Sequence, residues 1–396
     1  MKKKLLFVME SLGIGGAEKS LVTLLSQLDY SKYDVDLFLF HPKGEFMDLI
    51  PNEVNLLNVP EDFKRFILGP KESLKELVRG RKFKLLIYKT IEVANMAFNK
   101  FVLNKEYIGW NIIKQSFETI EKEYDVAIGF LEKKSIYFIV DKVKAKKKIG
   151  WIHIDYSKIE HNHKLDNMYF RNLNNIITVS DHCKEVLDEE FPHYKDKTKI
   201  IQNIISPTLI DSMSNKNQKD ISMNDNRVII CTVCRLTVQK GIDIAIECCE
   251  ALVNKGLKIK WIVVGDGSER ERLESMINEK GLKDIFILIG SRSNPYPYIK
   301  MCDIYVQPSR WEGFGITVAE AKVLRKPIVV SNIPEFVEQI DDNKTGMIYS
   351  DVNEMISKIE RLLINVNHRQ LLAENLKNIN MNNYNEINKL ESILNN

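Results

Sequence analysis

The sequence predicts an α/β fold with two parallel-sheet units in succession. Short apolar runs alternate with longer amphipathic stretches along all 396 residues, which is typical of strands buried on both faces of a sheet and joined by crossover helices. A polar stretch without an apolar period, Asp211–Asn226, interrupts this alternation, which then starts again. Hydrophobic residues make up 44% and charged residues 28% of the chain, a globular composition that excludes a disordered or coiled-coil protein.

The first half opens with a strand, a glycine-rich turn and a helix. Lys4–Met9 is apolar after its first residue, Gly13–Gly16 permits a tight turn, and Ala17–Leu28 has the spacing of an amphipathic helix. Further apolar runs continue the alternation of strands and helices. The strands predicted after the first are Val35–Phe40, Lys84–Tyr88, Val126–Phe130, Ile149–Ile152 and Ile176–Val179.

The second half repeats the alternation, and a cleft between the two halves is the expected ligand site. Its predicted strands are Val228–Val233, Lys260–Val264, Ile285–Ile289, Ile304–Val306 and Pro327–Val330, and its predicted helices are Gly241–Val253, Ser268–Glu279 and Gly315–Leu324. We expect a first domain over 1–205, a linker over 206–226 and a second domain over 227–396, with the option that the last helix crosses back. Ligands of open parallel sheets bind at the carboxyl ends of the strands.

Charge and cysteine content narrow the functional classes. Lys and Arg number 57 and Asp and Glu 54, so the net charge is +3, too low for a dedicated nucleic-acid binder. Six cysteines are too few for a disulfide scaffold and suit a reducing compartment. Glu10 ends the apolar run that follows Lys2–Lys4, which makes that run too short for a signal peptide. We therefore expect a cytoplasmic protein.

The segment Arg310–Ala321 carries the strongest functional signal. It lies between a predicted strand and a predicted helix, and Gly313 and Gly315 allow the backbone to turn tightly and approach a ligand. The backbone N–H groups at the helix start, around Gly315–Thr317, form an anion site. Glu320 lies about 7 Å farther along the helix, given a rise of ~1.5 Å per residue. The arrangement fits a nucleotide diphosphate that carries a sugar.

With Glu312, Glu320 completes a Glu-x7-Glu pattern, through which the chain resembles retaining glycosyltransferases of family four, of the glycosyl transferases group 1 type. The resemblance extends over nearly the whole chain. It includes Gly13–Glu18, Trp151–His153, Arg235–Gly241, Val264–Gly267, Met301–Asp303 and Pro308–Ser309. It implies the GT-B fold, in which two Rossmann-like domains face each other across a cleft, the first for the acceptor and the second for the donor.

The resemblance also implies site residues. It assigns catalytic roles to Glu312, His153, Arg235 and Lys240. It assigns donor binding to Gly15, Gly16, Arg235, Lys240, Gly265, Gly267, Ser291, Arg292, Glu312, Gly313, Phe314, Gly315, Ile316, Thr317 and Glu320. Arg235 and Lys240 are expected to neutralise the β-phosphate as the sugar leaves. The chain departs from the family at Cys234, where the family usually has glycine.

The activity implied is transfer of a hexose or N-acetylhexosamine, with retained configuration, from a nucleotide-sugar to a hydroxyl group. A UDP-sugar is favoured as donor, no cofactor or metal is expected, and the acceptor is a glycan or lipid-linked oligosaccharide of bacterial cell-surface polysaccharide synthesis. Two alternatives stay open, a nucleotide-sugar epimerase on the same fold and a non-catalytic partner subunit of a glycosyltransferase. Cys231-x-x-Cys234 and His161-x-His163 are too incomplete to predict a metal site.

A basic stretch of the first domain bears on whether the protein contacts the cell membrane. From Glu61 to Ile120 the chain has 12 Lys or Arg and 7 Asp or Glu, a net charge of +5, interleaved with aromatic and aliphatic residues. Such a stretch is either an ordinary solvated face or a peripheral contact with anionic lipid on the inner face of the cell membrane. Both interpretations stay open at this point.

Overall fold

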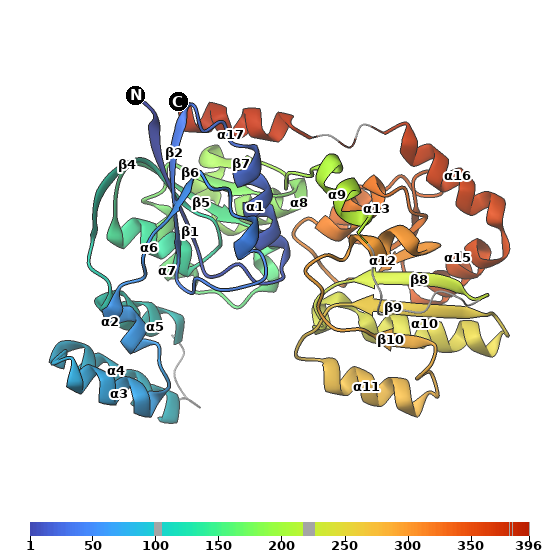
Figure 1. Cartoon of the computed structure of the whole chain (residues 1–396), viewed down its shortest axis with the longest axis horizontal. Helices are drawn as coiled ribbons and strands as arrows, with labels where there is room; N and C mark the ends of the chain where they lie inside the picture. The colour runs from blue at the N-terminus through green and yellow to red at the C-terminus, as the bar shows by residue number, and fades with distance from the viewer. Residues whose placement is uncertain (99–104, 217–225, 380, 382, 396) are drawn as a thin grey trace.

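The protein consists of two α/β domains side by side, each built on a parallel sheet (Figure 1). The computed structural model describes residues 1–98, 105–216, 226–379, 381 and 383–395. The first sheet has the strand order β3-β2-β1-β4-β5-β6-β7 and the second the order β10-β9-β8-β11-β12-β13. In both sheets the order reverses beside the first strand, which opens a crevice at the carboxyl ends of the strands.

The first sheet is parallel throughout. Its strands are β1 Lys3–Met9, β2 Tyr33–Leu39, β3 Val54–Leu56, β4 Ile120–Gly129, β5 Val143–Ile152, β6 Asn175–Thr178 and β7 Thr198–Ile200. In the central strand, Leu5 pairs with Val35 of β2 and with Val126 of β4, and all three side chains are buried. Burial on both faces explains why β1 has an almost continuous apolar sequence.

Helices cover both faces of this sheet, and four of them form a projection from the first domain (Figure 1). The helices are α1 Gly16–Gln27, α2 Glu61–Phe66, α3 Pro70–Arg79, α4 Phe83–Phe98, α5 Lys105–Ile113, α6 Lys134–Lys142, α7 His163–Phe170 and α8 Asp181–Glu190. The projection comprises α2–α5, inserted between β3 and β4.

The prediction of a strand over Lys84–Tyr88 is wrong, because these residues lie in α4. Leu85 and Lys89, four positions apart, are both buried, Leu85 in a cluster with Leu77 of α3 and Lys89 over the Phe66 ring of α2, whereas Ile87 between them is exposed. That spacing is helical. Over five residues, an apolar run does not distinguish a strand from part of a helix.

The second sheet is also parallel and carries its own helices. Its strands are β8 Val228–Val233, β9 Ile259–Val264, β10 Phe286–Leu288, β11 Ile304–Gln307, β12 Ile328–Ser331 and β13 Met347–Tyr349. Its helices are α10 Ile242–Asn254, α11 Arg270–Glu279, α12 Tyr296–Met301, α13 Ile316–Val323, α14 Pro334–Val337, α15 Val352–Ile364 and α16 Val366–Lys377. Every strand predicted in this half is present, with ends shifted by no more than two residues.

The expected linker over 206–226 contains a helix, α9 Pro207–Ser214. Ser206 caps it by accepting a hydrogen bond from the Leu209 N–H, and proline occupies its first turn, as at many helix starts. Ile210 is buried, and α9 packs against α12 and α13. The segment expected to be a linker thus includes a short helix over residues 207–214, while residues 217–225 lie outside the described part.

The last helix, α17 Asn385–Asn395, lies on the first domain, close to the N-terminus (Figure 1). Lys3 Nζ donates to the Leu394 carbonyl at 2.9 Å, and Lys147 Nζ donates to the Ile393 carbonyl at 2.7 Å. Lysines that satisfy the last carbonyls of a helix stabilise its C-terminus. Leu390 and Leu394 are buried, so this attachment is hydrophobic as well as polar.

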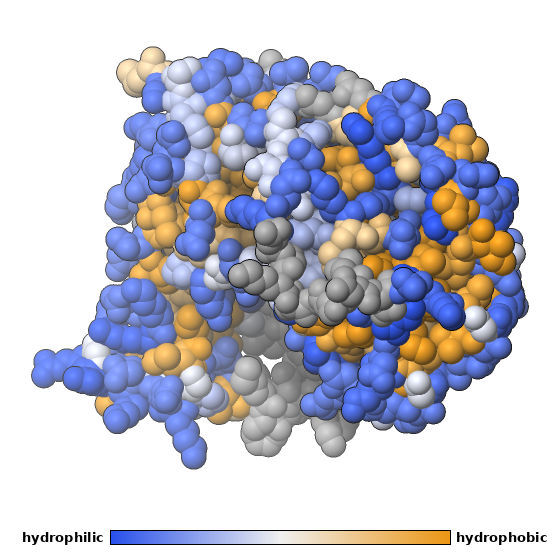
Figure 2. Space-filling model, turned by 45° about the vertical axis from the view of Figure 1, so that its right-hand side comes forward, coloured by the Kyte–Doolittle hydropathy of each residue, from blue (hydrophilic) through white to orange (hydrophobic). Residues whose placement is uncertain are grey.

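The surface turned forward in Figure 2 is mostly hydrophilic, with hydrophobic side chains gathered in patches between the charged ones. The exposed large hydrophobic residues of the second domain include Ile364, Val366 and Leu371, on α15 and α16. Within the described residues, no helix combines the length and the apolar character that crossing a membrane requires.

Candidate active site

A cavity of about 470 Å³ lies between the two domains, where the carboxyl ends of both sheets meet. The first domain contributes its wall from the loops after β1, β2, β4, β5 and β7, and the second from the loops after β8, β9, β10 and β11. Most of the residues predicted from sequence line it. These are Gly15, Gly16, His153, Arg235, Lys240, Gly265, Ser291, Arg292, Glu312, Gly313, Phe314, Gly315, Ile316 and Thr317. Gly267 and Glu320 are not among the lining residues.

The turn before α13 brings the two domains into contact. A Cβ atom on Gly313 would lie 1.9 Å from the His153 carbonyl oxygen, so only glycine allows the second domain to approach the first this closely. Gly315 has φ +78°, and a Cβ there would lie 2.5 Å from the Phe336 ring. Arg310 anchors the turn with two hydrogen bonds of 2.9 Å to Asp243. The start of α13 is thereby fixed at the cavity wall.

Lys240 and Glu312 form an ion pair in the second-domain wall. Lys240 Nζ lies 2.7 Å and 2.6 Å from the two carboxylate oxygens of Glu312. Ser309 Oγ donates to the same carboxylate at 2.6 Å. Glu312 is buried, so the lysine charge compensates a carboxylate that would otherwise be costly to hold there.

Glu320 lies at the contact between the two domains. Its carboxylate forms an ion pair with Lys19, which reaches across from α1 of the first domain. Tyr296 OH donates to Glu320 Oε1 at 3.1 Å, and Lys19 Nζ lies 4.3 Å from the centre of the Tyr296 ring. The second oxygen, Oε2, is buried without a hydrogen-bond partner in the described structure. The predicted donor-binding carboxylate thus also joins the two domains.

His153 follows β5 and faces the cavity with a neutral ring. Phe130 and Trp151 pack beside it, at ring-centre distances of 4.8 Å and 5.8 Å. Burial lowers the pKa of His153 to about 3. The neutral imidazole can donate or accept a hydrogen bond, but it carries no positive charge at neutral pH.

This burial predicts a specific acid sensitivity. The pKa of His153 is lower in the folded protein than its usual 6.5, so the unfolded chain binds a proton that the folded chain does not. The contribution of the neutral His153 ring to the free energy of unfolding is fully present above pH ~6.5. As the pH falls from there toward 3, the free energy of unfolding decreases by at most ~1.4 kcal/mol per pH unit. Urea unfolding between these limits should show a shallower pH dependence for His153→Gln than for the unaltered protein. Parallel profiles would contradict the assignment.

Five charged residues that line the cavity in the described structure were missed as site residues in the sequence: Glu18, Lys19, Glu45, Glu132 and Asp266. Glu18 and Lys19 directly follow the predicted glycine turn, and Glu132 follows the predicted strand before β5. Burial raises the pKa of both Glu18 and Glu132. Glu132 accepts a hydrogen bond from the His153 N–H at 3.3 Å. Position at a strand's carboxyl end is the signal that could have identified Glu132.

The cysteine and histidine pairs have ordinary environments. All six cysteines are free, and burial raises the pKa of Cys234 to about 12. Ring nitrogens of His161 and His163 lie 3.0 Å and 2.8 Å from backbone carbonyl oxygens. Neither pair belongs to a group of three metal-ligating side chains in the part of the chain that is described.

The second domain matches a known family. Residues 213–379 match the family glycosyl transferases group 1. The α-D-kanosaminyltransferase of Streptomyces kanamyceticus is 32% identical over 155 residues, 38% of this chain and 40% of that protein. The O-antigen biosynthesis glycosyltransferase WclY of Escherichia coli is 34% identical over 148 residues, 37% of this chain and 40% of that protein. The chain thus spans about two fifths of the length of the curated relatives it matches.

Solved structures resemble the whole chain. The crystal structure of Anabaena Alr3699/HepE in complex with UDP and glucose has a TM-score of 0.72 and 16% identity, over 99% of both chains. A variant of S. aureus TarM, in complex with fondaparinux, alpha-GlcNAc-glycerol and UDP, has a TM-score of 0.68 and 15% identity over 100% of both chains. At these identities the likeness shows the fold, and the expected GT-B architecture is confirmed.

Proposed function

We propose that this chain, whose residues 213–379 match the glycosyl transferases group 1 family, is a retaining glycosyltransferase of bacterial cell-surface polysaccharide synthesis. It moves a hexose or N-acetylhexosamine from a nucleotide diphosphate sugar to a hydroxyl group of a glycan or lipid-linked acceptor. One observation carries the proposal: Arg235, Lys240, Glu312 and the start of α13 line the same cavity between the domains.

The second-domain wall suits the donor diphosphate. Arg235 and Lys240 supply positive charge, and α13 presents backbone N–H groups at its N-terminus. These groups stabilise the charge that develops on the β-phosphate as its bond to the sugar breaks. Glu320 binds the ribose hydroxyls in this proposal. A UDP-sugar is favoured because the similar Alr3699/HepE was crystallised with UDP-glucose.

The first-domain wall suits a hydroxyl-rich acceptor. Glu18, Glu45 and Glu132 line it, and carboxylates accept hydrogen bonds from sugar hydroxyls. An acceptor oxygen attacks the anomeric carbon from the face that the diphosphate leaves, which retains the configuration. The bond between the anomeric carbon and the phosphate oxygen breaks, and the departing phosphate takes the proton of the acceptor hydroxyl. No step passes through a metal ion.

Nucleotide-sugar binding and turnover test the proposal together. We expect UDP and a UDP-sugar to raise the melting temperature, because each binds the folded state alone. Incubation with the UDP-sugar and an acceptor should release UDP and yield a glycoside with retained configuration. Formation of an isomeric UDP-sugar without UDP release would identify an epimerase. Binding without turnover over a panel of acceptors would favour a non-catalytic subunit.

We also propose that α4 rests on the inner face of the cell membrane. Phe83, Ile87 and Ile91 form a stripe on this helix at four-residue intervals and are 63%, 63% and 44% exposed. Lys82 and Lys84 flank the start of the stripe. Apolar side chains next to lysines suit an interface that contains anionic lipid.

Replacing Ile87 with serine should weaken binding to phosphatidylglycerol vesicles about 10- to 100-fold, because a buried side chain of this size contributes ~1.5–3 kcal/mol. Vesicle cosedimentation provides the measurement. Leu371→Ser on α16, 54% exposed in the second domain, is the matched control and should bind as the unaltered protein does. Equal binding by both variants would contradict contact through α4.

A further inference from the structure

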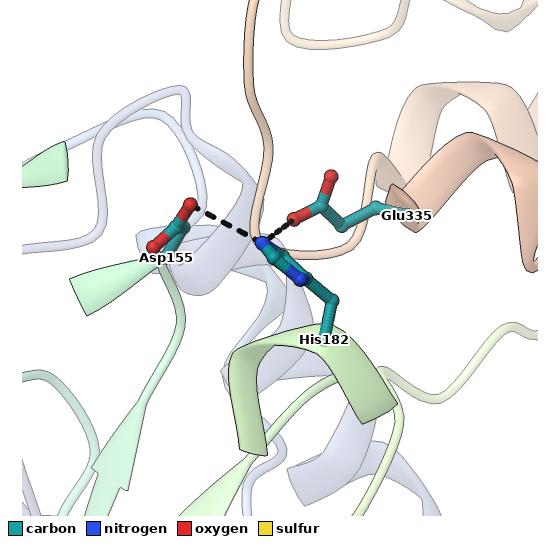
Figure 3. A group of neighbouring side chains, drawn as sticks. All are labelled: Asp155, His182 and Glu335. Carbon is teal, nitrogen blue, oxygen red and sulfur yellow. Dashed lines mark ion pairs between the residues drawn. The ribbon is translucent and has the colours of Figure 1, made fainter. Parts of the chain in front are cut away.

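Three metal-ligating side chains meet at the contact between the two domains, beside the cavity (Figure 3). Asp155 follows β5, His182 lies in the first turn of α8, and Glu335 lies in the first turn of α14. His182 Nε2 lies 3.4 Å from Asp155 Oδ2 and 3.9 Å from Glu335 Oε1. One ligand atom from each residue falls within 4.8 Å of the other two. Two domains therefore contribute to one compact group.

The two carboxylates are oriented toward this group. The Ser157 N–H and hydroxyl donate to Asp155 Oδ1 at 3.0 Å and 2.7 Å, which leaves Oδ2 directed at His182. Glu335 is 2% exposed, and its Oε1 is buried without a hydrogen-bond partner in the described structure. Figure 3 shows this oxygen pointing at the His182 ring. A buried carboxylate oxygen in such a position needs a partner that the protein itself does not supply.

The two buried carboxylates of this group favour the binding of a cation. Asp155 is also only 2% exposed, so two carboxylates are buried together around a single imidazole. A single imidazole can balance at most one of two carboxylate charges.

We propose that Asp155, His182 and Glu335 bind one divalent ion of the zinc class. One imidazole nitrogen with two carboxylate oxygens suits Zn²⁺ better than Mg²⁺ or Ca²⁺, which prefer all-oxygen sites. Bonds of ~2.0–2.1 Å in a tetrahedron place ligand atoms ~3.3 Å apart. The His182–Asp155 separation of 3.4 Å is close to this value, and the His182–Glu335 separation of 3.9 Å would have to shorten on binding. A water molecule would occupy the fourth coordination position of the ion.

The site has a structural consequence, separate from the sugar-transfer chemistry proposed above. Two of its ligands belong to the first domain and one to the second, and the observed arrangement of the domains presents all three. An ion bound to all three stabilises that arrangement. It takes no part in bond making, which is left to the cavity groups.

Zinc titration of the full chain tests the proposal. Isothermal titration calorimetry with Zn²⁺ should give one site per chain, and Mg²⁺ should give none. His182→Gln and Glu335→Gln should abolish the site. Ser157→Ala, which removes the hydroxyl that orients Asp155, should weaken Zn²⁺ binding about 10- to 100-fold.

A second histidine–carboxylate pair provides the matched control. His161 Nε2 lies 3.8 Å from Glu190 Oε2, with both residues in the first domain and no third ligand assigned to the pair in the described structure. His161→Gln should bind Zn²⁺ as tightly as the unaltered protein. Absence of a site in the unaltered protein, or equal Zn²⁺ affinity after His182→Gln, would overturn the proposal. Circular dichroism checks that each variant is folded, and the partly exposed His182 keeps the test valid if Glu335→Gln does not fold.

Discussion

Replacing Lys240 with methionine should lower the kcat of sugar transfer by about 100- to 1,000-fold, the usual loss when one group that stabilises developing charge is removed. Lys240 lines the cavity, and its Nζ donates hydrogen bonds to both carboxylate oxygens of Glu312. Methionine keeps an unbranched apolar chain but has no charge for the departing diphosphate. The rate of UDP release, with donor and acceptor both saturating, is the measurement. A kcat within a few-fold of the unaltered value would contradict the role of Lys240.

Stability must be separated from catalysis in this experiment. The single exchange leaves Glu312 buried with Ser309 as its remaining hydrogen-bond donor, and breaking a buried ion pair costs about 3–5 kcal/mol. The double variant Lys240→Met/Glu312→Gln removes both charges. Urea unfolding should show that it regains most of the lost stability, while kcat stays low because both groups act on the sugar donor. Recovery of kcat along with stability would show that Lys240 is a structural residue.

The sequence predicts the second domain better than the first for a physical reason. Strands such as Val228–Val233 are buried on both faces, so their apolar runs coincide with the strands. Short edge strands such as β3 Val54–Leu56 have exposed residues and no such run. In α4, exposed apolar side chains fill the gaps between buried ones, which conceals the helical period.

The same reasoning explains which parts of the site could be found. Glycine turns and strand-end cations are local patterns, and they place Arg235, Lys240 and Gly313–Thr317 at the cavity. Contacts between domains join residues that are distant in the chain, as in the pair of Lys19 with Glu320. Nothing in the local sequence of either residue specifies the other. Such pairs follow only from the packing of both sheets around one crevice.

The pair of Lys19 with Glu320 gives a prediction of its own. Replacing Glu320 with glutamine should weaken UDP binding about 10- to 100-fold, because each hydrogen bond from a ribose hydroxyl to a charged group contributes ~1.5–3 kcal/mol. Glutamine keeps the size of the side chain and can still accept the Tyr296 hydrogen bond. Isothermal titration calorimetry with UDP measures the dissociation constant directly, without an acceptor.

The partner residue distinguishes donor binding from a purely structural ion pair. If Glu320 binds the ribose, Lys19→Gln removes only the cation that otherwise pairs with this carboxylate, and UDP affinity should fall much less than in Glu320→Gln. If the pair only holds the domains together, either exchange breaks it, and both variants should lose UDP affinity equally. Tyr296→Phe removes one hydrogen bond from Glu320 and keeps the charge of Glu320, so the UDP affinity of this variant should be close to that of the unaltered protein. Equal losses of UDP affinity for Lys19→Gln and Glu320→Gln would show that Glu320 does not bind the donor. The nucleotide would then be bound by Arg235, Lys240 and the start of α13.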